Sequence, residues 1–550
     1  MGFLRERPIV TSYEECHDDG CVILRNGFHS AQGHVVEEWV EELHAGSEDS
    51  SDASTIASVD GDPLNLLDMM SAVKVLLVGL GEDVNRDGLL KTPLRVAQAF
   101  QDATRGYRQS AKDVVGGALF MEPGASGSNG SGGGCGGIVV VRNVDLFALC
   151  EACLLPFRIR CHIAYIPVGE RVVGLSKLPR VAEIFAKKLQ NPHRFANEVV
   201  LSLTEALQPE PLGVAVAVES WHLQWPGAKE SGVVADLESH VGWVSSTVYA
   251  GTGQFEDKSG ALWEELVALL QLQCHSVENR AAPKVGIDDT NPSGCPFAHF
   301  DALPLENGDT AVLPQSCNGC SEKDIFGNGL QKTSRTSRFE LDCTVPALPD
   351  MVSAVEALLR AIGEDPNREE LRLTSMRFVR WLLTSTQGSR MGTPGYLDLM
   401  SGLQVLTCEP DLVSNSGLVE EGISTAFDFP FCSQCEHHLL PFLGVVHVAY
   451  LAQRQGRGRR QQLDRDNVQR VVRGYSLRLQ VQERLTREIA EAIGGSVMVM
   501  VEASHMCMLS RGVQQVASST TTYASLGLFS SNSKLRTAFL QLVAQRTKIG

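Results

Sequence analysis

Hydrophobic and polar positions follow a recurring order along the chain, with helical periodicity first and extended segments after it. Apolar residues spaced for one face of a helix predict a helical pair at Met69–Leu80 and Leu89–Ala103. Two extended segments are predicted next, at Ile138–Val144 and Arg160–Pro167. A longer helical pattern then covers Leu178–Leu207. The first half is therefore predicted to contain two helices, strands and a long helix.

The second half of the chain repeats this order. Val468–Ile493 has apolar residues at about 3.6-residue spacing with Arg, Gln and Glu on the opposite face, which predicts a long amphipathic helix. Val497–Met508 predicts an apolar strand, as Val214–Glu219 does in the first half, where a last helix begins near Gly260. This order predicts an α+β fold in which an antiparallel sheet carries helices on one side.

Three short sequence words recur at a nearly constant distance. The pairs are LLVGLGEDVNR at Leu76–Arg86 with LLRAIGEDPNR at Leu358–Arg368, CEACLLPF at Cys150–Phe157 with CEHHLLPF at Cys435–Phe442, and VESWH at Val218–His222 with VEASH at Val501–His505. Equivalent residues are 282 to 285 positions apart in all three pairs. A register kept over this length indicates two tandem copies of one domain, because a solenoid would have shorter and more numerous repeats.

The repeat divides the chain into four predicted parts. Residues 1–63 are acidic and are expected to be disordered, and residues 64–273 form the first copy. Residues 274–347 are rich in Cys, Asn, Gly and Ser, which is typical of a flexible linker. Residues 348–550 form the second copy.

Composition and charge narrow the class of protein. The chain has 550 residues, 43% of them hydrophobic and 21% charged, as in ordinary globular proteins. Its net charge of −17 argues against nucleic acid or an anionic membrane as a partner. No apolar run reaches the roughly 18 residues of a membrane span, and the N-terminal region has no signal-peptide core. With 15 cysteines, we expect a cytoplasmic protein whose reduced thiols are available to metals.

A cluster of metal-ligand residue types occurs in the second copy. Cys435 and His438 are three residues apart in a predicted tight turn, which suits two ligands of one ion. Cys507 is the third candidate, and His505 shares its face if both lie on the predicted strand. Two sulfurs and one nitrogen favour zinc, and three protein ligands leave the fourth position for water, as in catalytic sites. His437 and His505 are candidate proton carriers near neutral pH, although a lone histidine is more often structural.

The second copy resembles GTP cyclohydrolase I. The words that carry the resemblance are CEHHLLPF, LQVQERLT, EASHMCM and SSTTTYASLGLF, and the likeness covers both copies in a layout similar to the plant form. The resemblance implies two T-fold-like domains, Zn²⁺ as cofactor, and a homo-oligomer with active sites at domain interfaces. It implies hydrolysis of GTP to 7,8-dihydroneopterin triphosphate and formate, the first step of tetrahydrofolate biosynthesis, through attack of zinc hydroxide on guanine C8.

The resemblance also assigns roles to residues of the second copy. It implies that Cys435, His438 and Cys507 bind zinc and that His437 and His505 are the catalytic histidines. The corresponding substrate-binding residues are Gln482 and Glu483 for the guanine, Arg511 and Arg470 near the triphosphate, and Arg377 and Arg380 on the N-terminal helix.

The second copy departs from the family at a phosphate-binding motif, Gly-Leu-Ser-Lys-x-x-Arg. Its equivalent segment, Asp464–Arg470, reads DRDNVQR, so that Asp466 and Asn467 replace the Ser and the Lys. A carboxylate there should repel a triphosphate. We therefore expect the second copy to bind this end of GTP poorly.

The first copy shows the complementary pattern. It keeps the phosphate motif, with Ser176, Lys177 and Arg180 at a helix start suited to anions, and Arg95 corresponds to a basic residue of the N-terminal helix. It lacks the zinc and guanine residues, because the equivalent positions are Ala152, Cys153, Gln224, Pro192 and His193.

These complementary losses allow two interpretations. In the one that we favour, the two copies together build a composite site, within a chain or between chains. In the other, the first copy is a decayed structural partner. Two alternatives for the whole chain also remain: a catalytically weak regulator or scaffold of the folate pathway, and a zinc hydrolase acting on another purine.

Two further cysteine pairs have ligand spacing. Cys150 and Cys153 could bind a metal, but Cys161 on a predicted strand is the nearest other thiol, so we expect them to pack in the core. Cys317 and Cys320 in the linker have zinc-knuckle spacing without a convincing second pair.

Overall fold

The computed structural model describes residues 63–122, 137–168, 171–208, 210–224, 242–271, 295, 348–390, 406–409, 423–451, 454–455, 459–509 and 518–547. Almost all of the predicted segment 1–63 lies outside the described residues, and so does the linker 274–347 apart from Cys295. The described residues of both copies from Leu66 onward fall within one compact unit. No helix of the described part is long and apolar enough to cross a membrane.

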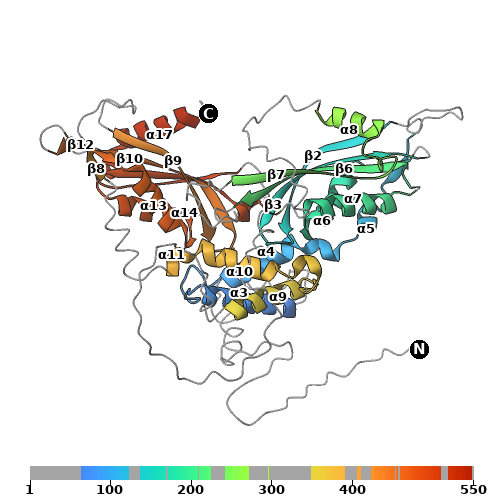
Figure 1. Ribbon diagram of the computed structural model, residues 1–550, viewed down its shortest axis with the longest axis horizontal. Coiled ribbons are helices and arrows are strands. Elements are labelled where there is room, and N and C mark those ends of the chain that lie inside the picture. The colour runs from blue at the N-terminus through green and yellow to red at the C-terminus, as the bar shows by residue number, and fades with distance from the viewer. Residues whose placement is uncertain are drawn as a thin grey trace, which may run out of the picture. The chain divides into compact units, whose positions relative to one another are not determined.

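The first copy runs from blue to green in Figure 1. Its elements are α3 (Pro63–Gly79), α4 (Thr92–Ala103), the 3-10 helix η1 (Arg105–Arg108), α5 (Ala111–Val115), β1 (Leu119–Met121), β2 (Val139–Cys150), β3 (Pro156–Ile166), β4 (Arg171–Val173), α6 (Lys177–Ala186), β5 (Leu189–Gln190), α7 (Pro192–Ala206), β6 (Gly213–Gln224), β7 (Gly242–Gly253) and α8 (Ala261–Gln271).

The second copy runs from yellow to red and repeats the order. Its elements are α9 (Leu348–Ala361), η3 (Glu369–Leu371), α10 (Thr374–Ser385), α11 (Gln387–Arg390), β8 (Leu406–Glu409), β9 (Ile423–Cys435), β10 (Pro441–Leu451), β11 (Arg454–Gln455), β12 (Arg459–Leu463), α13 (Arg465–Ser476), β13 (Leu479–Gln480), α14 (Gln482–Ile493), β14 (Val497–His505), α15 (Met506–Leu509), β15 (Thr520–Ser525), α16 (Leu528–Ser531) and α17 (Ser533–Thr547).

Each copy is built on a mixed five-stranded sheet. The strand order is β5-β2-β3-β6-β7 in the first copy and β13-β9-β10-β14-β15 in the second. The prediction of two tandem α+β domains is confirmed. The predicted purely antiparallel sheet is wrong at one edge, because the two-residue strands β5 and β13 pair parallel to β2 and β9.

The two long predicted helices are each divided in two. In the first copy α6 ends at Ala186 and α7 begins at Pro192, with β5 between them. In the second copy α13 ends at Ser476 and α14 begins at Gln482, with β13 between them. Helical periodicity on both sides of a two-residue strand hides the break. Proline at the start of α7 marks it, since the first turn of a helix needs no amide donor there.

Helices cover both faces of each sheet, so the prediction of helices on one side is wrong (Figure 1). In β3 of the first copy, Ile163 belongs to the core that includes α6 and α7, whereas Ala164 packs with Trp263 of α8. In β14 of the second copy, Val499 faces α13 and α14, whereas Met498 packs against α17. Alternating strand residues point to opposite faces, and both faces here are apolar.

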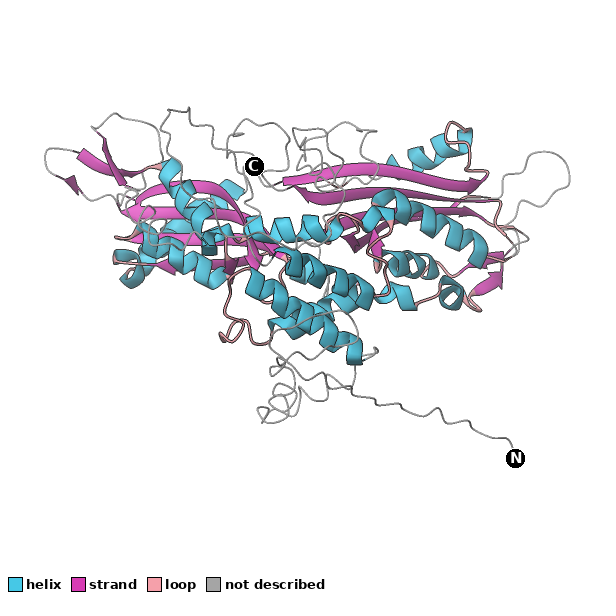
Figure 2. Ribbon diagram, turned by 60° about the horizontal axis from the view of Figure 1, so that its bottom comes forward, coloured by secondary structure: helices cyan, strands magenta, loops and turns pink. Residues whose placement is uncertain are grey.

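One hydrophobic core joins the two copies. It includes residues of α3 and α4 from the first copy and of α9 and α10 from the second, such as the fully buried Leu77 and Leu359. These helices lie side by side in Figures 1 and 2. A Cβ atom at Gly79 would lie 2.5 Å from the Met351 side chain, so α3 and α9 approach each other closely at this glycine.

A histidine supports the same strand irregularity in both copies. Asn143 and Asp428 have positive φ angles of 57° and 60°, at the points where the strand pairings shift register. Their backbone N–H groups donate to Nδ1 of His162 and His447, each at 3.3 Å. Both imidazoles are buried, and burial lowers the pKa of each below its ordinary value.

Candidate active site

A tight turn between β9 and β10 presents the first two ligand candidates. The Cys435 N–H donates to the Leu440 carbonyl and the Leu439 N–H donates to the Cys435 carbonyl, both at 2.9 Å. Leu439 closes the turn at φ 51° with its side chain buried in the shared core. The turn thereby brings Cys435 and His438 within 4.8 Å of each other and of Cys507, measured between ligand atoms.

Cys507 reaches this group from a helical turn and not from a strand. β14 ends at His505, and Cys507 lies in α15. The expected i, i+2 relationship of His505 and Cys507 along a strand is therefore wrong. Both side chains still lie near the turn, since Cys507 and His505 each interact with Cys435.

The chemistry of this group fits zinc. Both ring nitrogens of His438 are buried and have no hydrogen-bond partner among the described residues, so a lone pair is available to a metal ion or to a water. The pKa of Cys435 is far below its ordinary value, chiefly through a hydrogen bond with Cys507 and also through the nearby histidines. A thiolate, a second sulfur and an imidazole form a donor set that zinc favours, and three ligands leave one position open.

His505 is held in one orientation. Its Nε2 contacts Oε1 of Gln482 at 2.8 Å, and its ring stacks on Phe442 with centroids 4.5 Å apart. The Thr520 hydroxyl donates to the same Gln482 oxygen at 2.6 Å, while Gln482 Nε2 donates to the Val501 carbonyl at 3.0 Å. Gln482 is buried, and both of its amide atoms are engaged by the protein.

The remaining candidates of the second copy lie around this centre. His437 is half-buried, and its hydrogen bond with Cys435 raises the pKa of its imidazole. Burial and the charge of Arg95 from the first copy oppose that rise. Gln482 and Glu483 lie in the first turn of α14, not in the middle of a long helix, and Glu483 is exposed. Arg511 lies outside the described residues.

The two phosphate motifs differ in their helix starts. In the second copy Asp464 accepts backbone hydrogen bonds from Asp466 and Asn467 at 3.0 and 3.2 Å, so its carboxylate already occupies the start of α13. The exposed Arg470 donates to the Asn467 side chain at 3.1 Å. In the first copy Ser176 makes no such capping bond at the start of α6.

The basic residues of the first copy's motif remain accessible. Ser176 and Arg180 are exposed and Lys177 is half-buried. No hydrogen bond or ion pair in the described part of the chain joins these three residues to the second copy. Arg377 and Arg380 are half-buried on α10, the helix whose first residue contacts the first copy.

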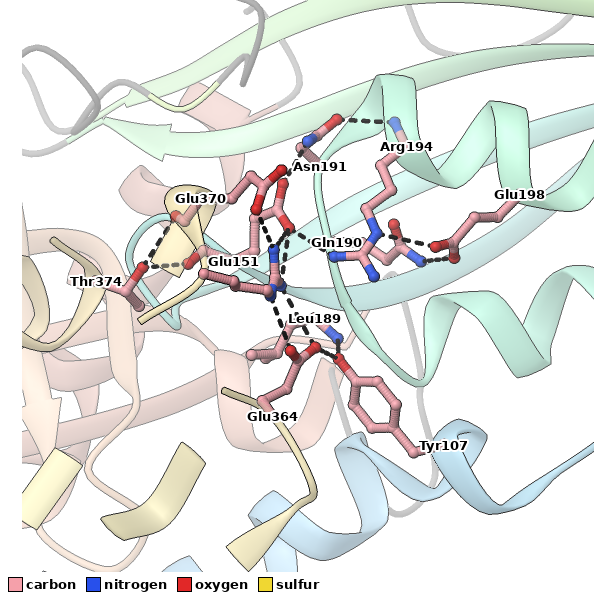
Figure 3. Close-up of polar contacts among 11 residues, drawn as sticks. Tyr107, Glu151, Leu189, Gln190, Asn191, Arg194, Glu198, Glu364, Glu370 and Thr374 are labelled. Carbon is pink, nitrogen blue, oxygen red and sulfur yellow. Dashed lines mark hydrogen bonds and ion pairs between the residues drawn. The ribbon is translucent and has the colours of Figure 1, made fainter. Parts of the chain in front are cut away.

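Polar contacts between the copies support the turn that follows Cys150 in the first copy and the turn that follows Cys435 in the second, and they do so in the same way. Arg86 of the first copy contacts the buried carboxylate of Glu436 at 2.8 Å, and Thr92 donates to the Glu436 carbonyl at 2.8 Å. The mirror contacts are Arg368 with the Glu151 carboxylate at 3.2 Å and Thr374 with the Glu151 carbonyl at 2.6 Å (Figure 3).

A second group of ligand-type side chains joins the first copy to the linker, and the sequence indicated only Cys150 and Cys153 as a possible metal pair, with core packing expected instead. Cys150, Cys153, His222 and Cys295 have ligand atoms within 4.8 Å of one another, and all four residues are buried. Cys161, the thiol that the sequence suggested as nearest, is not part of the group. The repeated VESWH and VEASH words could have pointed to His222, whereas no local pattern points to Cys295. Cys317 and Cys320 lie outside the described residues.

Comparison with known proteins agrees with this geometry. A family model described as GTP cyclohydrolase I matches residues 69–237 and 351–544, one region in each copy. GTP cyclohydrolase 1 of Solanum lycopersicum is 38% identical over 507 residues, which cover 91% of this chain and 97% of the relative. The Arabidopsis thaliana protein of the same name is 39% identical over 481 residues, covering 87% and 90%. That of Dictyostelium discoideum is 45% identical over 167 residues, covering 29% and 66%. The chain therefore belongs to the GTP cyclohydrolase I family of enzymes, in the two-copy form of its plant relatives.

Proposed function

We propose that this chain hydrolyses GTP to 7,8-dihydroneopterin triphosphate and formate, the first step of tetrahydrofolate biosynthesis. The plant relatives named GTP cyclohydrolase 1 support the reaction, since they match across both copies. The observation that carries the proposal is the convergence of Cys435, His438 and Cys507 beside His505.

The chemistry is assigned to the second copy. Cys435, His438 and Cys507 would hold zinc, which supplies a Lewis acid that makes water nucleophilic near neutral pH. His505 and His437 exchange protons with the purine as the imidazole ring opens. Gln482 acts as a positioning residue, because its carbonyl contacts His505 Nε2 and fixes the ring.

Recognition of the guanine is assigned to Glu483. Its carboxylate is exposed in the first turn of α14, one residue beyond the Gln482 that supports His505. A carboxylate accepts two parallel N–H bonds, which matches the donor edge of guanine. With Gln482 engaged by the protein, Glu483 is the better candidate to distinguish guanine from adenine.

Binding of the triphosphate is assigned mainly to the first copy. Arg95 lies near enough to His437 to affect its titration, so it is a first-copy candidate for the triphosphate within the chain. Ser176, Lys177 and Arg180 have no described contact with the second copy. We therefore propose that they serve the second copy of a neighbouring chain, which makes the protein a homo-oligomer with composite sites between chains.

The reaction can be tested directly with purified full-length protein. GTP should yield formate and a fluorescent pterin after oxidation, and removal of zinc with a chelator should stop both. Production of formate from ATP but not GTP would favour a hydrolase of another purine. Stable binding of GTP without any product would favour a regulator or scaffold.

A further inference from the structure

We propose that the first copy holds a structural zinc ion, bound by Cys150, Cys153, His222 and Cys295. Cys150 and Cys153 flank the turn between β2 and β3, His222 lies in β6, and Cys295 comes from the segment between α8 and α9. This site is separate from the proposed catalytic centre, and the inference does not depend on the proposed reaction.

The spacing of the four donors fits one tetrahedral ion. All four ligand atoms lie within 4.8 Å of one another. With Zn–S and Zn–N distances of about 2.3 and 2.0–2.1 Å, a tetrahedral site separates sulfur from nitrogen by about 3.5 Å and two sulfurs by about 3.8 Å. The distance from Cys153 Sγ to His222 Nε2 is 3.4 Å, close to that edge length.

His222 is oriented as zinc-binding histidines are. Its Nδ1 lies 2.9 Å from the Leu223 carbonyl, which can only accept a hydrogen bond, so Nδ1 carries the hydrogen and the lone pair lies on Nε2 facing Cys153. The ring also stacks on Phe157 with centroids 6.0 Å apart. A ligand whose second nitrogen bonds a carbonyl is the usual arrangement around protein-bound metals.

The number and burial of the ligands indicate a structural role. Cys150, Cys153, His222 and Cys295 are exposed by 2%, 1%, 5% and 0%. Three thiols and one imidazole complete a tetrahedron and leave no position for water, as in structural zinc sites. In the second copy, by contrast, three ligands suffice for an open site, and Cys507 is only half-buried.

The first copy reaches this set by changing the second copy's pattern at single positions. Cys150 and Cys153 occupy the places of Cys435 and His438, and His222 occupies the place of His505. Gln224 stands where the second copy has Cys507, and Cys295 supplies the missing sulfur from another segment. Equivalent positions thus hold a three-ligand group in the second copy and part of a four-ligand group in the first.

The ion would stabilise the contact between the copies. Glu151 lies between Cys150 and Cys153 in the sequence, and its carboxylate contacts Arg194 of its own copy at 2.9 Å. Figure 3 draws this contact. Arg368 and Thr374 of the second copy bind the same residue. A zinc ion bound by Cys150 and Cys153, on either side of Glu151 in the sequence, would fix the turn that α10 contacts. The ion would also attach Cys295 to the sheet.

The test uses full-length protein in which the three ligand candidates of the second copy have been substituted. A chain carrying Cys435→Ser, His438→Ala and Cys507→Ser leaves the first copy unaltered. Mass spectrometry of metals should find about one zinc per chain there, against about two in the parent protein. Co²⁺ exchanged into this chain should give the intense visible absorption of a tetrahedral thiolate site.

Substitutions in the first copy then identify the ligands. Adding Cys153→Ser and Cys295→Ser should remove the remaining zinc and the Co²⁺ absorption. Cys161→Ser is the matched control, because Cys161 is an equally buried thiol of β3 outside the group, and zinc should remain. Circular dichroism establishes that each chain is folded.

Three results would overturn the proposal. One is a folded chain with Cys435, His438 and Cys507 substituted that contains no zinc and takes up no Co²⁺. This result overturns the proposal even if the variants of Cys153 and Cys295 misfold. Another is zinc that persists without Cys153 and Cys295, or that is lost equally with Cys161→Ser. The third is a disulfide between any two of Cys150, Cys153 and Cys295 in peptides mapped without reduction.

Discussion

Arg86 of the first copy donates a 2.8 Å hydrogen bond to the buried carboxylate of Glu436, the residue that follows Cys435 in the second copy. Arg484 contacts the same oxygen at 2.7 Å from its own copy. Burial alone would raise the pKa of Glu436, but the two guanidinium groups outweigh it and hold the pKa below its ordinary value. The turn carrying two ligand candidates is therefore supported from both copies.

Arg86→Gln should weaken that support. Loss of one charge-assisted hydrogen bond to a buried carboxylate that keeps Arg484 should cost about 1.5–3 kcal/mol of unfolding free energy. Zinc should also be taken by a competing chelator at a lower concentration, since the turn holding Cys435 and His438 loosens. Urea unfolding measures the first effect and chelator titration the second. Arg360→Gln removes an exposed pair with Glu356 and should change neither measurably.

Cys507→Ser should remove zinc from the second copy and abolish turnover. The serine hydroxyl is a much poorer ligand than a thiolate, so a three-ligand site loses most of its affinity. Metal content should fall by about one zinc per chain. Cys432→Ser, which alters a buried thiol of β9 outside both groups, is the control and should keep zinc and activity. Normal turnover in Cys507→Ser would mean that Cys507 is not a ligand.

Lys177→Ala should lower kcat/KM for GTP by about 10- to 150-fold, as expected for the loss of one charge-assisted phosphate contact. Most of the change should appear in KM if the contact is equally strong in the ground and transition states. Lys112→Ala removes an exposed lysine with a weak 3.7 Å pair to Glu205 and should leave the kinetics unchanged.

Coexpression of an impaired chain and an inactive chain, assayed at GTP concentrations below KM, separates composite sites between chains from sites within one chain. Lys177→Ala keeps the zinc residues and Cys507→Ser keeps the phosphate residues. If the site forms between chains, mixed oligomers should recover activity well above either variant alone. If each site uses Lys177 and Cys507 of the same chain, mixing should recover nothing. Both tagged chains are purified together, and activity is compared at equal protein.

The second copy expressed alone from Leu348 should be unstable and a poor catalyst. It would expose the apolar faces of α9 and α10, which pack with α3 and α4 in the shared core, and it would lose Arg86 and Thr92. Coexpression with residues 64–273 should restore solubility and raise activity. Full activity and a monodisperse state for the isolated copy would show that the first copy contributes neither stability nor chemistry.

Stability should fall as the pH drops below about 6.5, partly through His162 and His447. Burial holds their folded pKa values below those of the unfolded chain. The unfolded chain therefore takes up protons first, and this lowers the free energy of unfolding from the unfolded pKa downward. Above that pH these groups contribute no pH dependence. Replacing both histidines by Asn keeps a hydrogen-bond acceptor for the backbone N–H groups of Asn143 and Asp428. The dependence of the unfolding free energy on pH should then become flatter between about pH 6.5 and 5, as measured by urea unfolding.

Sequence patterns were sufficient to predict the tandem repeat, the α+β class and the metal-ligand group of the second copy. Helical periodicity in segments such as α13 and α14 follows from side-chain burial along one face, so it is visible in the residues. Cys435 and His438 are close in the chain, and the turn between β9 and β10 makes them neighbours in space. Local spacing was sufficient in each case because the interactions are local.

Other features depend on contacts between segments that are far apart in the chain, and they became visible only in the folded protein. β5 and β13 exist because Leu189 and Leu479 find partners in β2 and β9. Pro192 marks the break locally in the first copy, whereas α14 of the second copy begins without a proline. Arg86 contacts Glu436, which is 350 residues away in the sequence, because α3 and α4 of the first copy pack with α9 and α10 of the second. Cys295 joins Cys150, Cys153 and His222 from another segment. A ligand set of this kind is defined by distance in space, and a sequence records distance along the chain.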